Sequence, residues 1–298
     1  MPEGNTIHRF ARSHTRDFGG RIVRVSSPQG RFAAEAKRLD RRRFLRAEAY
    51  GKHLFHFWEG GLIVHVHLGM AGWFYRHRGR GPEPKASVRM RLSTLRRAPT
   101  RREGDVTVDL IGPPTCELLS SPAEVQAVLD RLGPDPLRAD ADPQRVWTEL
   151  RRRRRPIGDA LLDQRVISGV GNIYRNEALF LSGIHPLRPS NRLREEEWRE
   201  LWTTTSRLMR RGLRPGSIAT VDPRERPLAR ATGPGGKAYA RPGRDAFYVY
   251  QEEVCRRCGR ALREFPLSGR RMWVCRSCQP YRRSSAAGAT GALRAGSG

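Results

Sequence analysis

A chain of 298 residues, 38% of them hydrophobic, is long enough for two core-bearing domains or for one domain with a substantial appendage. Lys and Arg outnumber Asp and Glu by 57 to 30, and the formal charge of +27 indicates a polyanionic partner. Apolar runs such as Leu62 to Val64 are too short to span a membrane, so nucleic acid is favoured over a membrane as the partner.

The first predicted element is a helix that begins almost at the start of the chain. Residues recur at helical spacing behind a candidate cap at Asn5, namely Ile7, Phe10, Ala11, His14 and Phe18. The N-terminus is therefore expected to be tethered to the fold. It lacks the charged-then-apolar pattern of a secretory signal, so we expect the protein to stay in the cytoplasm.

The pattern from 21 to 119 is that of strands. Apolar residues alternate over 62–68, 88–92 and 106–110. Gly60-Gly61 separates the run that ends at Trp58 from the next one and predicts a hairpin turn. The segment is therefore expected to form an antiparallel sandwich or barrel.

Helical signals replace strand signals after Ser121-Pro122, a candidate cap followed by proline at the first helical position. Asp142-Pro143 repeats this pattern and opens another predicted helix. Further helices are predicted over 160–166, 173–181 and 195–211, the last of them ending before a glycine. The middle of the chain is therefore expected to be all-helical.

Two segments and the C-terminal end show no helical or strand period. Residues 132–137 are rich in helix breakers and indicate a hinge or the entry to a second domain. Residues 213–247 contain many Gly, Pro and Arg and predict a long loop. The Ser/Ala/Gly-rich tail beyond Tyr281 has nothing to bury and is predicted to be disordered.

Four of the five cysteines form the pattern Cys255-x2-Cys258 and Cys275-x2-Cys278, which is typical of a tetrahedral zinc site with four thiolates. In a reducing cytoplasm such pairs favour metal over disulfides. A closed site of this kind stabilises the fold and does not catalyse. The intervening segment carries Arg270, Arg271 and Trp273, so a zinc-pinned hairpin could present an arginine to phosphates. The remaining Cys116 is expected to be a buried, inert thiol.

The N-terminal residues offer a nucleophile. Removal of Met1 would expose a secondary amine at Pro2, which can attack a sugar aldehyde carbon. The resulting iminium at C1′ of a deoxyribose is an electron sink that eases loss of the 3′-phosphate. Glu3 is a candidate acid for the sugar ring oxygen. Alone, Met-Pro-Glu is weak evidence, because many chains begin this way.

Other candidates have structural readings that are favoured without further context. In Gly169-Val-Gly-Asn-Ile-Tyr174, the glycines allow a close backbone approach and Asn172 could bind a phosphate, but the residue could equally cap the next helix. Lys52 would by default be an exposed lysine. His65 and His67 share a strand face, and satisfied structural histidines are favoured over a metal site. The run 151–155 indicates a solvated face or nonspecific phosphate contacts.

Together these motifs resemble the formamidopyrimidine-DNA glycosylase and endonuclease VIII family of bifunctional DNA glycosylases over nearly all of residues 2–281. The matching motifs are Pro2-Glu3-Gly4, Gly51-Lys52, Leu68-Gly-Met-Ala-Gly72, Leu132-Gly-Pro-Asp-Pro-Leu137, Leu161-Leu-Asp-Gln164, Gly169-Val-Gly-Asn-Ile-Tyr174, Glu177-Ala-Leu-Phe180 and the four-cysteine finger. The four-cysteine pattern is the strongest single signal; the weaker motifs support one another, and the combination in this order is highly specific.

The resemblance implies an α+β fold with an N-terminal antiparallel β-sandwich and flanking helices, a helix-two-turn-helix domain and a C-terminal zinc-finger β-hairpin. The expected segments are the catalytic domain 1–120, a linker 121–140, the DNA-binding domain 141–247, the finger 248–281 and a disordered tail 282–298. Double-stranded damaged DNA would bend in the cleft between the first two domains of a monomer, with the damaged base flipped out.

The resemblance also implies roles for individual residues. Pro2 would be the nucleophile, Glu3 the acid and base, and Lys52 the third catalytic residue. Lys52, Asn172 and Arg270 would hold phosphates around the lesion. Met70 would fill the gap left by the extruded base. The finger arginine is Arg270 and not its neighbour 271, because the family places it five residues before Cys275.

Departures from the family pattern bear on the substrate. The start Pro2-Glu3-Gly4 resembles the endonuclease VIII branch, which favours oxidised pyrimidines. Residues 101–116 lack the Arg-Arg-Phe-Gly loop that wedges the opposite strand in many relatives, so the wedge residues stay unassigned. No lysine lies between Arg155 and Leu161, where the purine branch tends to carry one.

The leading hypothesis is a base-excision repair glycosylase and abasic-site lyase that cuts by β,δ-elimination. The alternatives are an oxidised-purine glycosylase, a non-catalytic protein that binds DNA damage, and a zinc-ribbon module that binds RNA. Intact Pro2, Glu3 and Lys52 argue against a non-catalytic protein.

Overall fold

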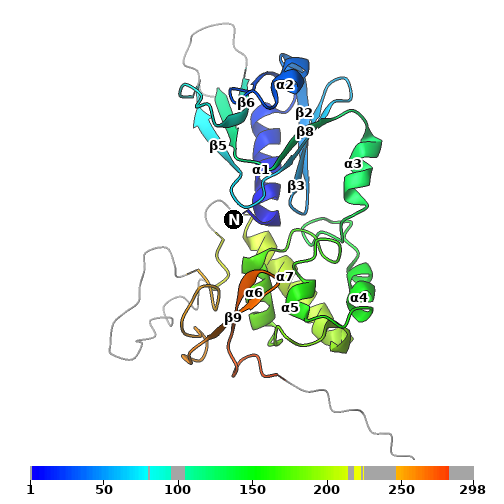
Figure 1. Ribbon diagram of the computed structural model, residues 1–298, viewed down its shortest axis with the longest axis vertical. Coiled ribbons are helices and arrows are strands. Elements are labelled where there is room, and N and C mark those ends of the chain that lie inside the picture. The colour runs from blue at the N-terminus through cyan, green and yellow to red at the C-terminus, as the bar shows by residue number, and fades with distance from the viewer. Residues whose placement is uncertain are drawn as a thin grey trace, which may run out of the picture.

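The computed structural model describes residues 2–79, 81–94, 105–213, 218–222, 224 and 246–281. Two lobes lie one above the other along the long axis, an N-terminal lobe of strands around helix α1 and a C-terminal lobe of helices with a small hairpin (Figure 1). The predicted α+β class is therefore confirmed.

The N-terminal lobe is built on an eight-stranded sheet in the order β5-β7-β6-β1-β2-β3-β4-β8, with antiparallel pairing throughout. The strands are β1 (Ile22–Ser26), β2 (Arg42–Tyr50), β3 (His53–Trp58), β4 (Ile63–His67), β5 (Trp73–Arg78), β6 (Val88–Thr94), β7 (Val106–Ile111) and β8 (Thr115–Leu119). β1 and β2 pair only at Ile22–Arg43 and Val23–Arg42. This short pairing divides the sheet into two halves, as a sandwich requires.

One core joins both halves of the sheet to α1 (Gly4–Phe18). Inward-facing residues of β6 alternate with less buried ones, and Val88, Met90 and Leu92 are all buried, as the period-2 pattern predicts. Burying each such side chain contributes about 1.5–3 kcal/mol. The hairpin at Gly60-Gly61 is also confirmed, because both glycines have positive φ and β3 pairs with β4.

The expectation that residues 21–119 form only strands is wrong. A helix, α2 (Ala33–Leu39), interrupts that segment. It buries only Ala36 and Leu39, and two buried side chains are too few to give the sequence a helical period.

The expectation of a helix over 160–166 is also wrong. The segment contains the end of α5 (Ile157–Ala160) and a loop with several buried residues. The side chain of Gln164 holds this loop by bonding to the backbone at Gly169 and Val170, so its apolar residues are buried without forming a helix.

The other predicted helices are also present. α3 (Pro122–Leu129) packs against the outer strands of the N-terminal lobe, through residues such as Val125 and Leu129. The C-terminal lobe contains α4 (Pro143–Arg151), α6 (Asn172–Leu181) and α7 (Glu195–Arg211), with a short 3-10 turn, η1 (Ser190–Arg192). The side chains of Ser121 and Asp142 accept backbone N–H groups as predicted N-caps. The hairpin β9 (Arg263–Leu267) and β10 (Arg270–Val274) adds Met272 to the helical core. The finger is therefore packed onto the helices.

The segment predicted as a hinge is anchored to the N-terminal lobe. Asp135 is fully buried, accepts a hydrogen bond from the Gly51 amide at 2.8 Å and pairs with His8 at 2.7 Å. The predicted domain bounds themselves stay a prediction. Most of the loop expected over 213–247, the whole tail 282–298 and part of the wedge segment, 101–104, lie outside the described residues.

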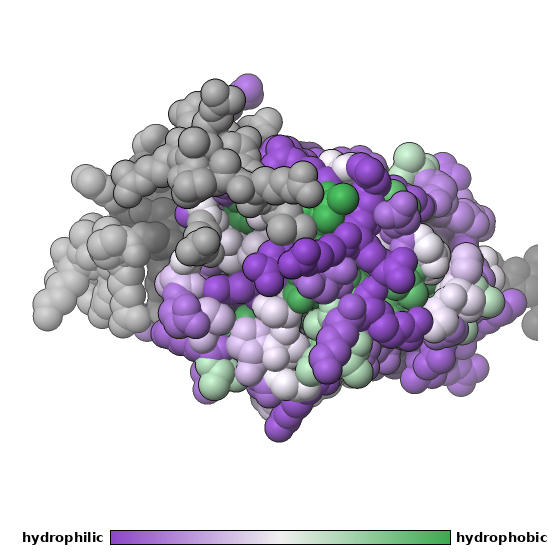
Figure 2. Space-filling model, turned by 90° about the horizontal axis from the view of Figure 1, so that it is seen from above, coloured by the Kyte–Doolittle hydropathy of each residue, from purple (hydrophilic) through white to green (hydrophobic). Residues whose placement is uncertain are grey.

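The surface is mainly hydrophilic on the face seen from above, with apolar residues scattered across it (Figure 2). The described residues include few exposed large apolar side chains, and Met70 is the most exposed of them at 67%. Within the described ranges, no helix is both long enough and apolar enough to cross a bilayer.

Candidate active site at the junction of the lobes

The side chain of Glu3 reaches from the N-terminal lobe to the first turn of α6. Its carboxylate accepts hydrogen bonds from the backbone N–H groups of Gly171 at 3.0 Å, Ile173 at 2.7 Å and Tyr174 at 3.4 Å. These amides have no partner within the helix, and the helix start favours negative charge. A fully buried carboxylate is thereby fixed directly after Pro2, which is itself buried.

The glycines of the motif over 169–174 make room for this contact. The Gly4 amide donates to the Gly169 carbonyl oxygen at 2.8 Å, and Gly169 has φ +84°. A Cβ on Gly171 would lie 2.4 Å from the Glu3 side chain. The alternative in which Asn172 caps α6 is wrong, because Asn172 is the first helical residue and Glu3 supplies the capping oxygens. The close approach predicted from the glycines is made by the chain's own N-terminus.

Lys52 is drawn to the same junction by the turn between β2 and β3. Gly51 has φ +57°, and a Cβ there would lie 2.8 Å from the Ser168 side chain. This close packing leaves Lys52 only partly exposed, so the default of an exposed surface lysine is wrong. Lys52 lies near enough to Glu3 and Arg270 for their charges to act on its ammonium group.

The electrostatics of the junction favour proton transfer. Burial raises the pKa of Glu3, while the charge on Lys52 and the three amide N–H groups oppose that rise. Burial also lowers the pKa of Lys52; the charge on Glu3 opposes this shift and the charge on Arg270 adds to it. A carboxyl group with a raised pKa beside a cation is suited to general acid and base chemistry.

Asn172 contacts the hairpin next to Arg270. The Asn172 amide donates to the Arg271 carbonyl oxygen at 3.0 Å, and Arg270 begins β10 after a turn in which Ser268 and Gly269 both have positive φ. Arg271 pairs with Glu264 across the hairpin at 3.2 Å, on a side chain that is 74% exposed. Arg270 is the hairpin arginine whose charge acts on Lys52.

Met70 lies apart from the buried groups, in the exposed turn between β4 and β5. The register pairs His53 with His67, so Lys52 and the turn that follows His67 leave the sheet at the same end. His67 accepts a hydrogen bond from the Gly69 amide at 3.2 Å, which stabilises the turn. No described contact joins Met70 to Glu3.

The four finger cysteines come together as predicted. All four Sγ atoms lie within 4.8 Å of one another, with Cys255 and Cys278 at 3.8 Å and Cys258 and Cys275 at 3.5 Å. Tetrahedral Zn–S bonds of about 2.3 Å place sulfurs about 3.8 Å apart, so these residues fit a metal ion. Among the described residues this is the only such cluster of three or more candidate ligands.

The remaining histidines and the fifth cysteine behave as structural groups. His65 hydrogen-bonds to Glu117 at 2.8 Å and to His53 at 2.9 Å, so it is satisfied without a metal. Cys116 is partly buried and not fully buried as expected; it packs against the core of the N-terminal lobe, and burial raises the pKa of its thiol to about 12. A raised pKa disfavours the reactive thiolate form.

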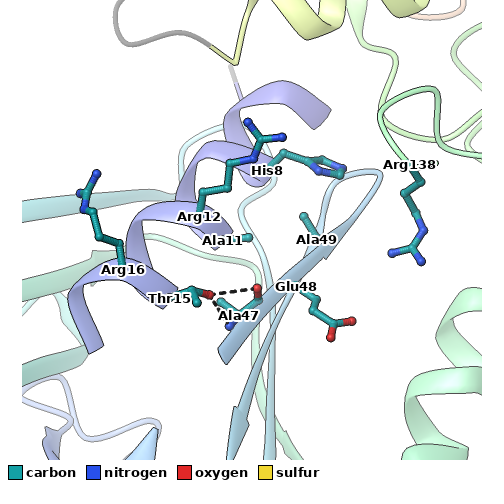
Figure 3. A pocket seen from close by; sticks show the side chains of 9 residues that line it. All are labelled: His8, Ala11, Arg12, Thr15, Arg16, Ala47, Glu48, Ala49 and Arg138. Carbon is teal, nitrogen blue, oxygen red and sulfur yellow. Dashed lines mark hydrogen bonds between the residues drawn. The ribbon is translucent and has the colours of Figure 1, made fainter. Parts of the chain in front are cut away.

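A separate groove of about 670 Å³ lies between α1 and β2. Its lining includes His8, Arg12, Arg16 and Arg138 (Figure 3). His8 pairs with Asp135, and Arg138 pairs with the exposed Asp140 at 2.7 Å. The groove contains none of the predicted site residues, and several of its charges are already balanced.

Sequence reasoning missed three buried polar residues that hold the junction together. Asp135 ties the linker to the Gly51 turn, and Glu177 accepts three backbone N–H groups from 248–250. Arg175 bonds to the hairpin through its guanidinium. A signal was present, because Asn172, Arg175 and Asn176 form a polar face at helical spacing on an otherwise apolar helix.

Comparison with known proteins decides the family. The model of the formamidopyrimidine-DNA glycosylase N-terminal domain matches residues 1–106, and that of the formamidopyrimidine-DNA glycosylase H2TH domain matches residues 132–222. The chain belongs to the formamidopyrimidine-DNA glycosylase family. It is a bifunctional DNA glycosylase and abasic-site lyase of base-excision repair that binds DNA, as the sequence predicted.

Individual relatives support the predicted branch. Endonuclease 8 1 of Mycobacterium tuberculosis is 45% identical over 94% of this chain and 100% of its own length. Probable endonuclease 8 2 of Streptomyces coelicolor is 34% identical over 88% of this chain and 87% of its own. The fold also matches the Lactococcus lactis Fpg in complex with DNA containing an abasic site, with a TM-score of 0.72, 22% identity, and coverage of 93% of this chain and 99% of that one.

Proposed function

We propose that the chain removes oxidised bases, with oxidised pyrimidines preferred, and nicks the strand through a Schiff base on Pro2. The observation that carries this proposal is the Glu3 carboxylate, buried directly after Pro2 and held by three amides at the start of α6. Lys52 adds positive charge beside it. A proline amine is intrinsically basic, so a nearby cation favours its neutral, nucleophilic form.

Glu3 and Pro2 divide the chemistry. The Pro2 nitrogen attacks C1′ and displaces the damaged base, which takes up the proton that the amine loses. Glu3, whose pKa burial raises, gives a proton to the sugar ring oxygen as the bond from C1′ to that oxygen breaks and the iminium forms. The resulting iminium withdraws electrons, so loss of a C2′ proton expels the 3′-phosphate. A second elimination expels the 5′-phosphate, and the gap is left with phosphates on both sides.

The other site residues would hold the DNA in register. Lys52, Asn172 and Arg270 come from the β2–β3 turn, the start of α6 and the hairpin. The charge on Lys52 acts on Glu3, that on Arg270 acts on Lys52, and Asn172 lies between the residues whose amides bind Glu3. Each can donate to phosphate oxygens around the extruded nucleotide. Met70, exposed on its turn, would fill the space that the base leaves in the duplex.

One Zn²⁺ per chain would be bound by Cys255, Cys258, Cys275 and Cys278. Its contribution is structural, because four thiolates leave no open coordination position. The ion would fix the finger, and with it the hairpin that carries Arg270, against the helical core. We further expect the enzyme to act as a monomer in the cytosol or nucleoid.

The preference for oxidised pyrimidines rests on two observations. The chain begins Pro2-Glu3-Gly4, as in the endonuclease VIII branch, and the two relatives named above are called endonuclease 8. A panel of duplexes with oxidised pyrimidines or oxidised purines opposite each base tests this preference. Faster excision of oxidised purines would favour the alternative assignment.

Borohydride trapping on abasic duplex tests the nucleophile. The mature protein should form a covalent adduct, and a variant with one extra residue before Pro2 should form none. An undiminished adduct from the blocked variant would defeat the assignment to Pro2. A mature protein that binds abasic duplex but gives neither adduct nor nick would favour the non-catalytic alternative.

A further inference from the structure

Helix α6 presents a buried polar face to the finger hairpin. Asn172, Arg175 and Asn176 lie at positions i, i+3 and i+4, and their exposures are 6%, 0% and 0%. Asn176 accepts a hydrogen bond from the Trp273 amide at 2.8 Å, and Asn172 donates to the Arg271 carbonyl oxygen at 3.0 Å. The hairpin is therefore held to the helix by specific polar contacts as well as by packing.

Arg175 is the centre of this face. One nitrogen, Nη1, donates to the carbonyl oxygens of Gly158 at 3.2 Å and Leu267 at 3.3 Å. The other, Nη2, donates to the Asn172 side-chain oxygen and, at 3.3 Å, to the Arg271 carbonyl oxygen. Leu267 and Arg271 flank the hairpin turn, so one guanidinium holds both sides of the turn that precedes Arg270.

A buried guanidinium of this kind is costly. Within the described part of the chain, no carboxylate hydrogen-bonds to Arg175, and oxygens of carbonyl and amide groups accept its N–H groups. The charges on Asp159 and Glu3 act on the guanidinium from a greater distance and favour its protonated form. Burial lowers the pKa of Arg175 to about 10, and the group stays protonated near neutral pH. An apolar side chain would fill the space at a lower desolvation cost, so packing alone does not account for an arginine here.

The contact with Asn172 fixes the direction of its amide. Arginine has five donors and no acceptor, so the Asn172 oxygen must face Arg175 and its NH2 group must face the other way. On that side lie the Arg271 carbonyl oxygen and the Tyr250 hydroxyl. Without Arg175 only the Arg271 carbonyl oxygen and the Tyr250 hydroxyl would hold the amide in this orientation. A flipped amide would present an oxygen, which would repel a phosphate.

We propose that Arg175 is a positioning residue that locks Asn172 and the turn carrying Arg270 into one phosphate-binding unit. The inference rests on the proposed function, because it assumes that Asn172 and Arg270 bind phosphates of the damaged strand. Arg175 itself touches neither substrate nor the reacting atoms. Replacing Arg175 should therefore lower the affinity for DNA more than it lowers the rate of base excision once DNA is bound.

The test is DNA affinity as a function of salt. Duplex with a reduced abasic site, which cannot be cleaved, is titrated with wild type, Arg175→Met and Arg175→Lys between about 50 and 200 mM salt. Each lost contact between a cation and a phosphate makes the slope of log K against log salt shallower by about 0.9, and Arg270 is the one cation of the unit, so Arg175→Met should lose up to about 0.9 of the slope. Its affinity should fall about tenfold or more. Lysine, with three donors on one nitrogen, should restore part of the slope.

Arg188→Met is the matched control, because Arg188 is part-buried in the same lobe but bonds to Glu197 and to the Arg192 carbonyl oxygen. It should keep the wild-type slope. Affinities are expressed per binding-competent molecule, so a lower melting temperature alone does not change the slope. A wild-type slope and affinity for Arg175→Met would overturn the proposal. If that variant does not fold, a wild-type slope for Arg175→Lys would overturn it.

The same experiment separates this inference from the proposed function. If wild type shows no preference for the abasic duplex and no borohydride adduct, the proposed function fails. The change of slope on replacing Arg175 would still be measurable on undamaged duplex in that case. If wild type and Arg175→Met have the same salt slope and wild type forms the borohydride adduct, only the proposed role of Arg175 is contradicted.

Discussion

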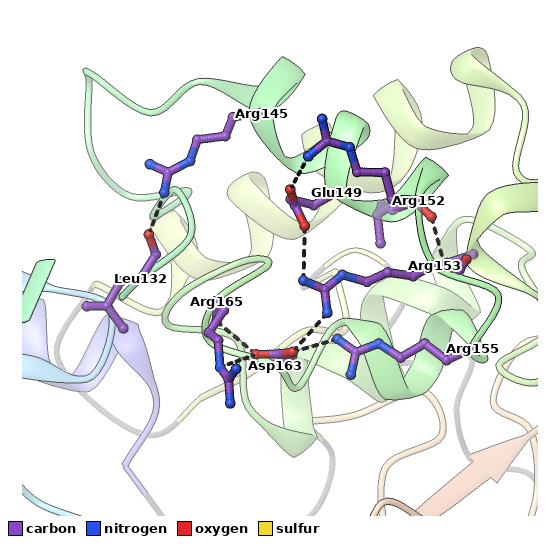
Figure 4. Close-up of polar contacts among 10 residues, drawn as sticks. Leu132, Arg145, Glu149, Arg152, Arg153, Arg155, Asp163 and Arg165 are labelled. Atoms are coloured by element: carbon purple, nitrogen blue, oxygen red, sulfur yellow. Dashed lines mark hydrogen bonds and ion pairs between the residues drawn. The ribbon is translucent and has the colours of Figure 1, made fainter. Parts of the chain in front are cut away.

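Two strongly charged regions of the molecule, the junction around Glu3 and the arginine-rich segment 151–155, are built in opposite ways. At the junction a carboxylate is fully buried, and the residues that act on it are far from it in the sequence, as Lys52 and Ile173 show. In the arginine segment the acidic partners, Glu149, Asp159 and Asp163, lie close to the arginines in the sequence. Arg152 and Arg153 bind Glu149 at 3.2 and 3.0 Å (Figure 4).

Exposure separates the two regions as well. In the arginine segment Arg152 is 70% exposed, and Arg153 and Arg155 are partly exposed at 32% and 28%, whereas Glu3 is fully buried. Exposed ion pairs contribute about 0–1 kcal/mol, because water already screens their charges. A buried carboxylate must be compensated by specific donors, as Glu3 is. A high density of charged residues in the sequence is therefore a poor indicator of a catalytic site. A buried charged side chain whose hydrogen-bond partners come from distant segments is a better one.

The largest expected effect is that of Glu3→Gln. Glutamine can still accept the amide N–H groups of α6, but it cannot transfer a proton. Base excision should therefore fall about 10²- to 10⁴-fold. Single-turnover excision from lesion duplex measures this, with Glu196→Gln, an exposed carboxylate of α7, as the control. A loss below tenfold would mean that burial of Glu3 serves structure alone.

Removal of the metal should have the next largest effect. Cys258→Ser is expected to lose zinc and to weaken binding of abasic duplex at least about tenfold, because the hairpin with Arg270 loses its anchor. Zinc content and DNA affinity are measured together. Cys116→Ser, outside the cluster, should keep both. Unchanged affinity in a zinc-free protein would show that core packing alone holds the hairpin.

A smaller effect is expected for Lys52→Met, namely a shift in the pH dependence of the rate of base excision. The charge on Lys52 opposes the raised pKa of Glu3, so removing it should raise that pKa further. The protonated, acidic form of Glu3 then persists to higher pH. The basic limb of the normalised excision profile should therefore move to higher pH. Lys37→Met in α2, on an exposed site far from the junction, should leave the limb in place.

The smallest effect is expected in the arginine segment. Arg152→Met removes an exposed ion pair with Glu149 and should change the free energy of unfolding by less than about 0.5 kcal/mol. Excision should change less than about twofold at fixed salt. A large loss of activity without loss of stability would contradict this contrast between the two regions, because it would show that the arginine segment binds DNA during catalysis.

Much of the fold follows from local patterns in the sequence. The bounds of α7 and the caps at Ser121 and Asp142 depend on residues close together, so the sequence predicts them well. Helix α2 was not predicted because it buries only two side chains, which is too few to give a helical period. The loop between α5 and α6 was not predicted because its shape depends on contacts with Glu3 and Gly4, which are distant in the sequence.

The site residues, too, are predictable where they depend on local spacing and not where they depend on distant contacts. The cysteine pairs are predictable because ligand spacing is local. The role of Asn172 at the start of α6 was not predictable, because the capping oxygens come from Glu3, some 170 residues away in sequence. The contribution of Arg175 was missed because only the folded hairpin supplies the carbonyl oxygens that it binds.

The most direct test of the account is to locate the covalent bond. The borohydride-trapped complex with abasic duplex is digested, and the modified peptide is identified by mass spectrometry. The account predicts a chain without its initiator methionine and a deoxyribose remnant on the nitrogen of Pro2. A remnant on Lys52, or efficient cleavage by a chain that still carries Met1, would contradict it.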